Sequence, residues 1–432
     1  MGALWHGFAD MGAVERDGAF VVARGAGAYI YDQAGTRYLD ATAGLWFTNV
    51  GHGRAEIADA VAAQLRTVAH YSNFGDFAEP ATQELAEKLA SIAPVPGSKI
   101  FFTSGGSDSV DTAAKLARRY WHELGRPDKT IVVGRQRAYH GMHVAGTALA
   151  GIPVNREGYG EPMADARTVE WDDAKALLAL IEEIGAERIA AFFCEPIIGA
   201  GGIYLPPDGY LTEVRRICRD HDILFVVDEV VTGFGRIGGS WFAATRFELE
   251  PDLMTTAKGL TSGYVPMGAV FMSDHVYETI AEGAGAAAVG HGYTYSAHPV
   301  SAAVGLEVLR LYENGLLENG VKAGARLMQG LESLRDHPLV GDVRGRGMLA
   351  AVELVVDKVN KTPLPASAEP ARRIFDRAWE NGLVIRAFGN GVLGYAPPLC
   401  CTETEIDAIV ERTRVTLDET LEDPDVRRAL QA

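Results

Sequence analysis

The chain has 432 residues, of which 47% are hydrophobic, so it can form two or three domains around a large core. Its formal net charge of −17 argues against nucleic acid or an anionic membrane surface as a partner. The four cysteines include no CxxC spacing, so neither a metal site nor a disulfide framework is indicated. No run approaches the roughly 20 apolar residues of a membrane span, and the N-terminus lacks the pattern of a signal peptide. We therefore expect a soluble, cytoplasmic protein.

The first part of the chain predicts short antiparallel strands followed by two helices. Residues 28–32 and 36–40 are rich in Tyr, Ile and Leu and flank a turn at 33–35. Apolar residues then recur at helical spacing in 54–70 and 80–93. The strands are too few to form a stable sheet of their own, so we expect them to pack on the C-terminal part of the chain.

From residue 99 onward, apolar strands alternate with amphipathic helices. The strands are expected at 99–103, 130–134, 188–196, 223–229 and 252–260, and the helices at 110–124, 174–185 and 212–221. This alternation predicts an α/β fold with a mostly parallel sheet that helices cover on both faces. Helices at 301–315 and 320–337 then lead to a tail of mixed strands and helices. We predict a large domain at 53–318 and a small α+β domain formed by 1–52 and 319–432.

Two of the apolar strands each carry one polar residue where an apolar one is expected. Asp228 ends the run at 223–229, and Lys258 lies among small residues in 252–260. A buried carboxylate needs a cationic partner, which a pyridinium ring can supply, although a simple helix cap is an alternative for Asp228. A lysine is rarely buried unpaired, which suggests a functional amine. Together they fit a pyridoxal phosphate (PLP) site, in which lysine holds the aldehyde as a Schiff base and the carboxylate keeps the ring nitrogen protonated.

Three other segments could complete such a site. The turn from Ser104 to Ser107, between a strand and a helix, offers backbone N–H groups to a phosphate, or is an ordinary glycine-rich turn. Tyr139 follows the next strand at the end where ligands bind in open α/β sheets, and either stacks on a planar ring or packs in the core. Glu195 also ends an apolar strand, and we favour a structural role for it.

These segments together resemble the class III (fold type I) PLP-dependent aminotransferases. The resemblance extends from about residue 5 to residue 399. Within the class, LWFTNVGHG and HGYTYSAHP look most like the ω-aminotransferases that use pyruvate as amino acceptor. The matching stretches are LWFTNVGHG, TSGGSDSVDTAAKLARRYW, AYHG, FFCEPIIGAGGIYLPPDGY, VVDEVVTGFGRIG, AKGLTSGYVPMGAV, HGYTYSAHP and APPL.

The resemblance implies catalytic roles for Lys258, as the Schiff-base lysine and proton carrier, and for Asp228, as the partner of the ring nitrogen. The implied substrate-binding residues are Trp46, Tyr293 and Arg386, of which the arginine grips the acceptor carboxylate and swings aside for an amine. The implied cofactor-binding residues are Gly105, Gly106 and Ser107 at the phosphate, Tyr139 and Val230 on the two ring faces, His140, Glu195, Asp228, Lys258, and Thr294, which reaches the phosphate of a partner subunit. A homodimer with shared sites, or a tetramer, is therefore implied.

One departure from the family pattern bears on the acceptor. Met142 and His143 stand where relatives that use 2-oxoglutarate often carry an arginine, which favours a monocarboxylate. We predict a ping-pong aminotransferase that moves an amino group from a primary amine or ω-amino acid to pyruvate or a similar 2-oxo acid. The alternatives are a 2-oxoglutarate-dependent class III aminotransferase, a PLP-dependent decarboxylase or aminomutase, and a homologue that has lost its chemistry.

Overall fold

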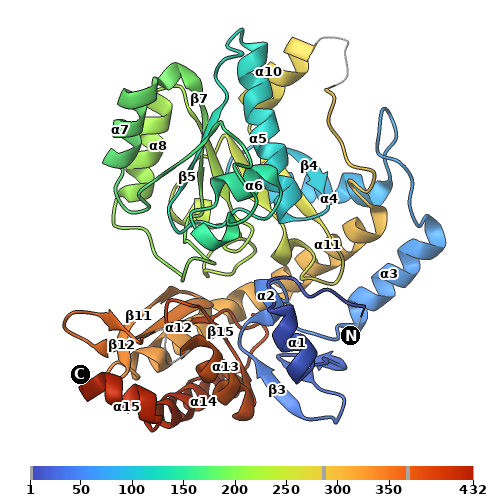
Figure 1. Ribbon diagram of the computed structural model, residues 1–432. Helices are drawn as coiled ribbons and strands as arrows, with labels where there is room; N and C mark the ends of the chain where they lie inside the picture. Colours follow the sequence, from blue (N-terminus) through green and yellow to red (C-terminus); the bar gives the residue numbers. More distant parts are fainter. Residues whose placement is uncertain (1–2, 285–288, 366–369, 432) are drawn as a thin grey trace.

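A seven-stranded sheet lies at the centre of the larger unit in the computed structural model, which describes residues 3–284, 289–365 and 370–431 (Figure 1). Its neighbours are parallel from β9 to β6, while β10 is antiparallel to both β9 and β4. The sheet is thus mostly parallel, as predicted. In spatial order the strands are β4 (Lys99–Thr103), β10 (Gly268–Met272), β9 (Leu253–Thr256), β8 (Leu224–Asp228), β7 (Ile189–Cys194), β5 (Ile131–Arg135) and β6 (Ala166–Val169).

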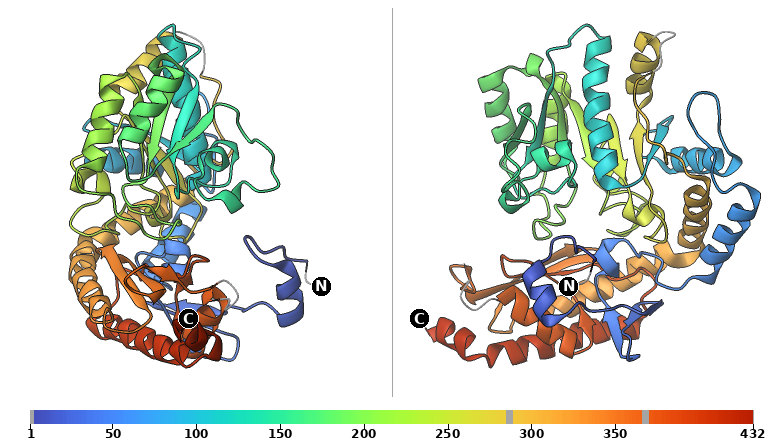
Figure 2. Two further views of the ribbon diagram at one scale, coloured as in Figure 1. Left: turned by 60° about the vertical axis from the view of Figure 1, so that its left-hand side comes forward. Right: turned by 45° about the vertical axis from the view of Figure 1, so that its right-hand side comes forward.

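Helices cover both faces of this sheet because successive strand residues point to opposite sides. Phe192 packs in the core cluster under α7 (Lys175–Ile184) and α8 (Tyr210–Asp220), whereas Phe193 packs in the cluster on the other face. That second face is covered by α5 (Gly106–Glu123), α6 (Val144–Leu149) and α10 (Asp274–Ala284) (Figure 2). Burial of each large apolar side chain contributes about 1.5–3 kcal/mol, which explains why these strands tolerate so few polar residues.

The smaller unit contains both ends of the chain. Its first sheet is β1 (Arg24–Ala26), β2 (Tyr29–Tyr31), β3 (Arg37–Asp40) and β14 (Leu383–Val384), in which β3 and β14 run parallel. The N-terminal strands therefore pack on the C-terminal part, as expected. Its second sheet is β11 (Val340–Arg346), β12 (Leu349–Asp357), β16 (Val392–Tyr395) and β15 (Arg386–Ala387), with β13 (Thr362–Pro363) paired to β12. Its helices are α12 (Leu317–Glu332), α13 (Pro370–Glu380), α14 (Glu403–Leu421) and α15 (Pro424–Gln431).

A long kinked helix connects the two units (Figure 1). Helix α11 (Pro299–Leu311) continues through a π-helical turn at Tyr312–Leu316 into α12, where the sequence predicted two separate helices. Gly315 takes a φ of 105° in that turn and produces the kink. The predicted boundary at 318 falls in the first turn of α12, and the domain limits stay a prediction.

The remaining α-helices in the described part of the chain are α1 (Met11–Asp17), α2 (Ala43–Trp46), α3 (Ala55–Thr67), α4 (Pro80–Ile92) and α9 (Ala243–Arg246). Helix α1 stands away from the body of the molecule and has no buried residue (Figure 2). Just before it, Trp5 and Phe8 are 82% and 74% exposed. In the part of the chain that the structure describes, no helix is long and apolar enough to span a bilayer.

Candidate active site

A cavity lies at the carboxyl ends of β5, β7, β8 and β9, which is the edge where open α/β sheets bind ligands. The N-terminus of α5 closes one side of it. The residues that line it are Gly106, Ser107, Val110, Tyr139, His140, Gly141, Glu195, Asp228, Val230, Val231, Ala257 and Lys258. The structure thus brings together most of the predicted cofactor-binding residues.

Lys258 lies two residues beyond the end of β9, where it begins a 3₁₀ turn. It has a φ of 39°, a conformation that costs a non-glycine residue roughly 1–2 kcal/mol and that is concentrated at functional sites. Its amine has no hydrogen bond or ion pair with any of the residues that the structure describes. Burial lowers the pKa of Lys258, although the charges of Asp228 and Glu195 oppose the change. The amine is therefore closer to its neutral, reactive form at physiological pH than an exposed lysine is.

Asp228 is the last residue of β8 and is almost fully buried. Its Oδ2 lies 2.8 Å from His140 Nδ1, and its Oδ1 accepts a hydrogen bond of 3.0 Å from the Val230 N–H. These contacts fix the carboxylate at the wall of the cavity. Asp228 is no helix cap, because no helix begins at residues 229–231.

The N-terminus of α5 provides the anion-binding end of the cavity. The helix begins at Gly106 rather than at the predicted residue 110, so Gly106 and Ser107 belong to its first turn. Gly105 is the N-cap residue of α5, and no side chain hydrogen-bonds to the helix N-terminus there. The N–H groups of the first turn are therefore available to an anion. A Cβ atom on Gly106 would lie 3.0 Å from Val230 Cγ1, and one on Gly141 would lie 2.5 Å from Ser107 Oγ. Glycine is thus required where these segments approach each other.

Both carboxylate oxygens of Glu195 bind backbone N–H groups, from two different segments of the chain. Its Oε1 accepts the N–H of Tyr139 at 3.0 Å, and its Oε2 accepts the N–H of Gly199 at 2.9 Å. Burial raises the pKa of Glu195, while the charge of His140 and these two hydrogen bonds oppose the change. Glu195 therefore positions Tyr139, whose side chain lines the cavity.

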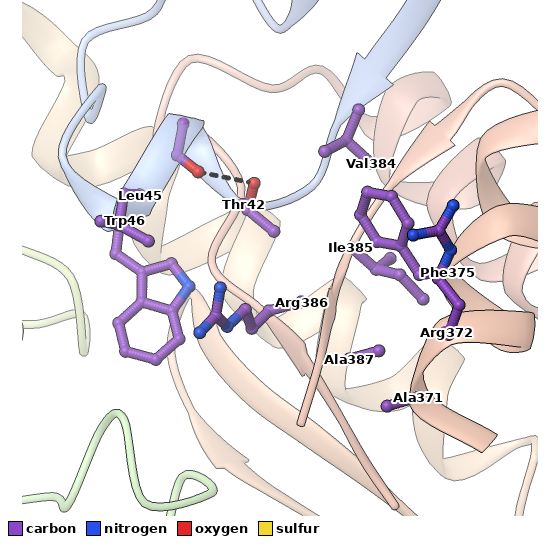
Figure 3. Close-up of a pocket in the computed structure, with 11 residues that line it drawn as sticks. Thr42, Leu45, Trp46, Ala371, Arg372, Phe375, Val384, Ile385, Arg386 and Ala387 are labelled. Atoms are coloured by element: carbon purple, nitrogen blue, oxygen red, sulfur yellow. Dashed lines mark hydrogen bonds between the residues drawn. The ribbon is translucent and has the colours of Figure 1, made fainter. Parts of the chain in front are cut away.

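A second cavity lies between the two ends of the chain (Figure 3). Its lining includes Trp46 of α2 and Arg386 of β15, whose guanidinium points toward the indole. Trp46 Nε1 is buried without a hydrogen-bond partner, and Arg386 makes no ion pair, within the described ranges. A Cβ atom on Gly199 would lie 3.1 Å from Trp46 Cζ3 and 3.5 Å from Val231 Cγ2. Because Val231 also lines the first cavity, the two cavities adjoin at Gly199.

Tyr293 and Thr294 reach neither cavity of their own chain. The hydroxyl of Tyr293 lies 3.1 Å from Thr112 Oγ1 and donates to the Asp108 carbonyl at 3.4 Å, both on α5. Within one chain, the structure does not place Tyr293 among the substrate-facing residues. Thr294 is exposed, so its predicted contact with a partner subunit stays a prediction.

Sequence reasoning missed Gly199 and Val231, which lie between the two cavities. The signal for Gly199 was present, since the run Gly199 to Gly202 directly follows a strand-end acid and such glycines mark close backbone approaches. Val231 carried no signal, because it lies in a run of apolar residues.

A mostly parallel sheet that presents a free lysine, an aspartate–histidine pair and an uncapped helix N-terminus to one cavity defines a fold type I transferase. The family model described as Aminotransferase class-III matches residues 11–417, and the chain belongs to that family. The predicted fold class and the predicted aminotransferase activity are thereby confirmed. Enzymes of this family depend on PLP.

Similar proteins cover almost the whole chain. The putrescine–pyruvate aminotransferase of Pseudomonas aeruginosa is 39% identical, over 96% of this chain and 93% of that protein. The diaminobutyrate–2-oxoglutarate transaminase of Halomonas elongata is 36% identical, over 91% of this chain and 89% of that protein. The omega transaminase of Pseudomonas jessenii in complex with PMP superimposes with a TM-score of 0.94 at 38% identity, covering 97% of this chain and 96% of that one.

Proposed function

We propose that this chain binds PLP in the first cavity and transfers an amino group from a primary amine or ω-amino acid to pyruvate or a similar 2-oxo acid. The observation that carries the proposal is the unpartnered amine of Lys258 in the same cavity as Asp228 and the uncapped N-terminus of α5. These groups match the three chemical features of the cofactor, which are an aldehyde, a ring nitrogen and a phosphate.

The lining residues fit PLP end to end. The N–H groups of Gly106 and Ser107 would hold the phosphate, and Asp228 would hold the protonated ring nitrogen. Tyr139 and Val230 would contact the two faces of the ring. When bound, PLP supplies an electron sink for the electron pair that remains after a proton leaves the substrate carbon.

The protein's own part in the reaction is to place and move that proton. Lys258, with its lowered pKa, would take the proton from the substrate carbon and deliver it to the carbon that carries the aldehyde of the free cofactor, acting as base and then as acid. Asp228 would be held in a fixed position for the ring nitrogen, because a histidine nitrogen and a backbone N–H contact its two oxygens. The Asp228–His140 pair would therefore keep the ring nitrogen protonated during proton transfer.

The second cavity would select the substrate. Arg386 would bind the carboxylate of the acceptor, and Trp46 would limit the size of the group beside it. The two relatives above use different acceptors, as their names state, at nearly the same identity to this chain. His143 supports pyruvate, because it pairs with Asp108 at 3.2 Å where an arginine would serve a second carboxylate. A 2-oxoglutarate-dependent reaction is the second candidate.

We also propose a homodimer with shared sites. The exposed Thr294 and the N-terminal segment with its exposed Trp5 and Phe8 support this, because such apolar exposure is typical of an interaction surface. The four cysteines are free, which supports a reducing compartment such as the cytoplasm.

A half-reaction with purified PLP-loaded protein tests the function. An amine donor added alone should convert the bound cofactor stoichiometrically to its amino form, visible as loss of the absorption band of the lysine-linked cofactor. Pyruvate should then restore the band. Release of carbon dioxide or formation of an isomerised amine would instead indicate a decarboxylase or an aminomutase, and faster restoration by 2-oxoglutarate would overturn the proposed acceptor.

A further inference from the structure

A short hairpin at residues 198–204 connects the active site to the small unit. Ile198 and Tyr204 form an isolated antiparallel bridge at its base. The N–H groups of Gly202 and Ile203 both donate to the Gly199 carbonyl at 3.0 Å, which closes a tight loop. Ile203 takes a φ of 53° there, a strained value for a β-branched residue, so the loop needs support from outside.

The inner part of this hairpin belongs to the active site. Gly199 donates its N–H to Glu195, which also accepts the N–H of Tyr139. Gly199 lies against the indole of Trp46 with no space for a side chain between them. A displacement of the hairpin would therefore move the wall between the two cavities.

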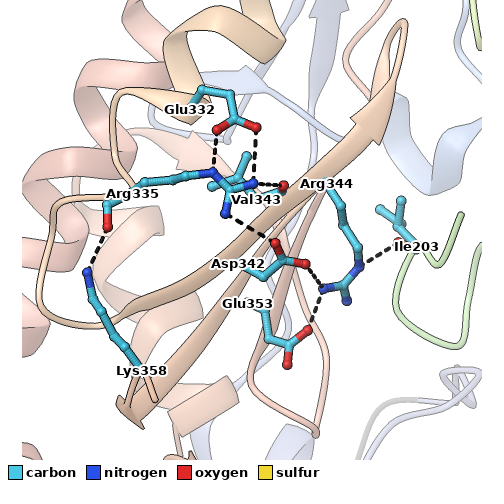
Figure 4. Close-up of polar contacts among 8 residues, drawn as sticks. All are labelled: Ile203, Glu332, Arg335, Asp342, Val343, Arg344, Glu353 and Lys358. Atoms are coloured by element: carbon cyan, nitrogen blue, oxygen red, sulfur yellow. Dashed lines mark hydrogen bonds and ion pairs between the residues drawn. The ribbon is translucent and has the colours of Figure 1, made fainter. Parts of the chain in front are cut away.

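Arg344 of β11 holds the outer part of the hairpin. Its Nε donates to the Ile203 carbonyl at 2.8 Å (Figure 4). Its Nη2 donates to the Gly202 carbonyl, also at 2.8 Å. The guanidinium carbon also lies 4.4 Å from the centre of the Tyr204 ring. Asn390 makes only long hydrogen bonds of 3.4 Å to the same hairpin. Arg344 thus makes the shorter of the hydrogen bonds from these two residues to the hairpin, beside the apolar packing of Ile203.

The rest of the guanidinium is held by carboxylates on the same sheet. Nη1 pairs with Asp342 at 3.2 Å and with Glu353 on the neighbouring strand (Figure 4). Burial works to raise the pKa of Asp342, but the hydrogen bond and charge of Arg344 outweigh it and the pKa is lowered. Only 12% of the Arg344 side chain is exposed. These ion pairs therefore fix the orientation of the Arg344 guanidinium group toward the hairpin.

The register of this sheet places Arg344 in one row with Arg386. Arg344 pairs with Ala351 across β11 and β12, and Ala351 pairs with Gly394 on β16. Gly394 in turn pairs with Arg386 on β15. Directly paired residues point to the same face of a sheet, so the row has an arginine at each end and two small residues between. A Cβ atom on Gly394 would lie 3.2 Å from Ile203 Cδ1, which shows that the hairpin occupies the space between the arginines.

We propose that Arg344 is a positioning residue for amino transfer, which clamps the 198–204 hairpin onto the small unit and so sets the wall formed by Gly199, Trp46 and Arg386. This inference rests on the proposed function. The role requires arginine, because only its planar fork donates to two adjacent carbonyls while pairing with carboxylates. Lysine at this position would keep the ion pairs and lose the clamp.

The test compares Arg344→Lys with Arg335→Lys in PLP-loaded protein. Arg335 belongs to the same ion-pair network, since it also contacts Asp342, but it makes no contact with the hairpin (Figure 4). For R344K we expect kcat/KM for the 2-oxo acid to fall about 10- to 100-fold, mainly through KM, because displacement by about 1 Å has effects of this size. The unfolding temperature should stay near that of the wild type. R335K, a change at a half-exposed ion pair, should stay within about twofold in kcat/KM.

Two results would overturn the inference. One is an R344K enzyme with wild-type kinetic constants, and the other is an equal loss in R335K and R344K, which would assign the effect to the ion-pair network. Arg344→Met provides the larger perturbation, and its circular dichroism spectrum shows whether any loss follows unfolding. Failure of the proposed function is distinguishable, because the wild-type protein would then not respond to an amine donor at all.

Discussion

The two adjoining cavities differ in how the fold builds them. The first is formed within the larger unit, from the ends of neighbouring parallel strands and the N-terminus of α5. Its acids Asp228 and Glu195 have their oxygens held by backbone N–H groups or a histidine. The second cavity is formed by segments from the two ends of the chain. There Trp46 Nε1 lacks a partner and Arg386 is exposed without an ion pair, as far as the described residues go.

Under the proposed function, this difference separates the residues of the chemistry from those of substrate specificity. Groups held by backbone hydrogen bonds on the ends of a rigid sheet do not reorganise during a reaction, which is what catalysis requires. The guanidinium carbon of Arg386 lies 5.7 Å from the centre of the Phe388 ring and the side chain makes no ion pair with the described residues, so under the proposed function it can reorient at little cost for a charged or an uncharged substrate. Changes in the first cavity should therefore affect every substrate, and changes in the second only some.

The largest expected effect is that of Lys258→Ala in the first cavity. Without the amine that transfers the proton, turnover should fall by at least about 10⁴-fold with every donor. Steady-state assays with several amines and both acceptors measure this. Cofactor binding, followed by absorbance, should persist without the band of the lysine-linked form. A variant with wild-type rates would contradict the site.

Asp228→Asn should reduce turnover by about 10²- to 10³-fold, again with every substrate. Asparagine keeps the shape and a hydrogen bond to Val230, but it lacks the charge that keeps the ring nitrogen protonated. The ratio of kcat values for a small amine and for a carboxylate-bearing donor, compared with that of the wild type, shows whether the loss is the same for both substrates. A loss confined to one substrate class would break the proposed separation.

Arg386→Ala should instead act selectively. We expect KM for the 2-oxo acid to rise about 10- to 100-fold, the size of a lost hydrogen bond to a charged group, while the half-reaction with a simple amine changes little. Arg372→Ala is the matched control, because Arg372 lines the same cavity (Figure 3) but hydrogen-bonds Asp376 at 2.8 Å. Equal losses for amines and carboxylates would contradict a specificity role.

The smallest effect on activity is expected for Glu229→Gln, next to Asp228 in sequence but directed away from the cavity. Glu229 accepts the Ala244 N–H at 2.6 Å and the Thr232 hydroxyl at 2.5 Å, and burial raises its pKa from 4.5 to about 7. Because the folded state then binds the proton more tightly, Glu229 lowers stability as pH rises from 4.5 to about 7. The resulting decrease in the free energy of unfolding is at most about 3 kcal/mol.

Glutamine does not titrate, so the variant should lose this part of the pH dependence. Urea unfolding at pH 5 and pH 8 measures the change, and kcat should stay within about twofold of the wild type, as for sites away from the chemistry. An unchanged pH dependence of stability would contradict the assignment.

The residues of the first cavity differ in how readily they could be predicted from the sequence. Asp228 and Lys258 were identifiable because a polar residue at the end of an apolar strand is conspicuous, and the carboxyl ends of parallel strands meet at one edge. The start of α5 was predicted four residues late, because glycine and serine have low helix propensity and the packing of Gly106 against Val230 is a tertiary contact. Tyr293 hydrogen-bonds to α5 within its own chain, so its expected contact with substrate stays a prediction.

The sequence by itself determined five of the seven strands of the larger sheet (all but β6 and β10), the class of chemistry and the two polar residues of the proposed cofactor site. These follow from local patterns, namely strand periodicity, glycine-rich turns and isolated charges in apolar runs. Only the tertiary structure decided how Trp46 meets Gly199 and how Arg344 shares a row with Arg386. Those contacts join segments far apart in the chain, and their register depends on strand pairing that no local pattern specifies.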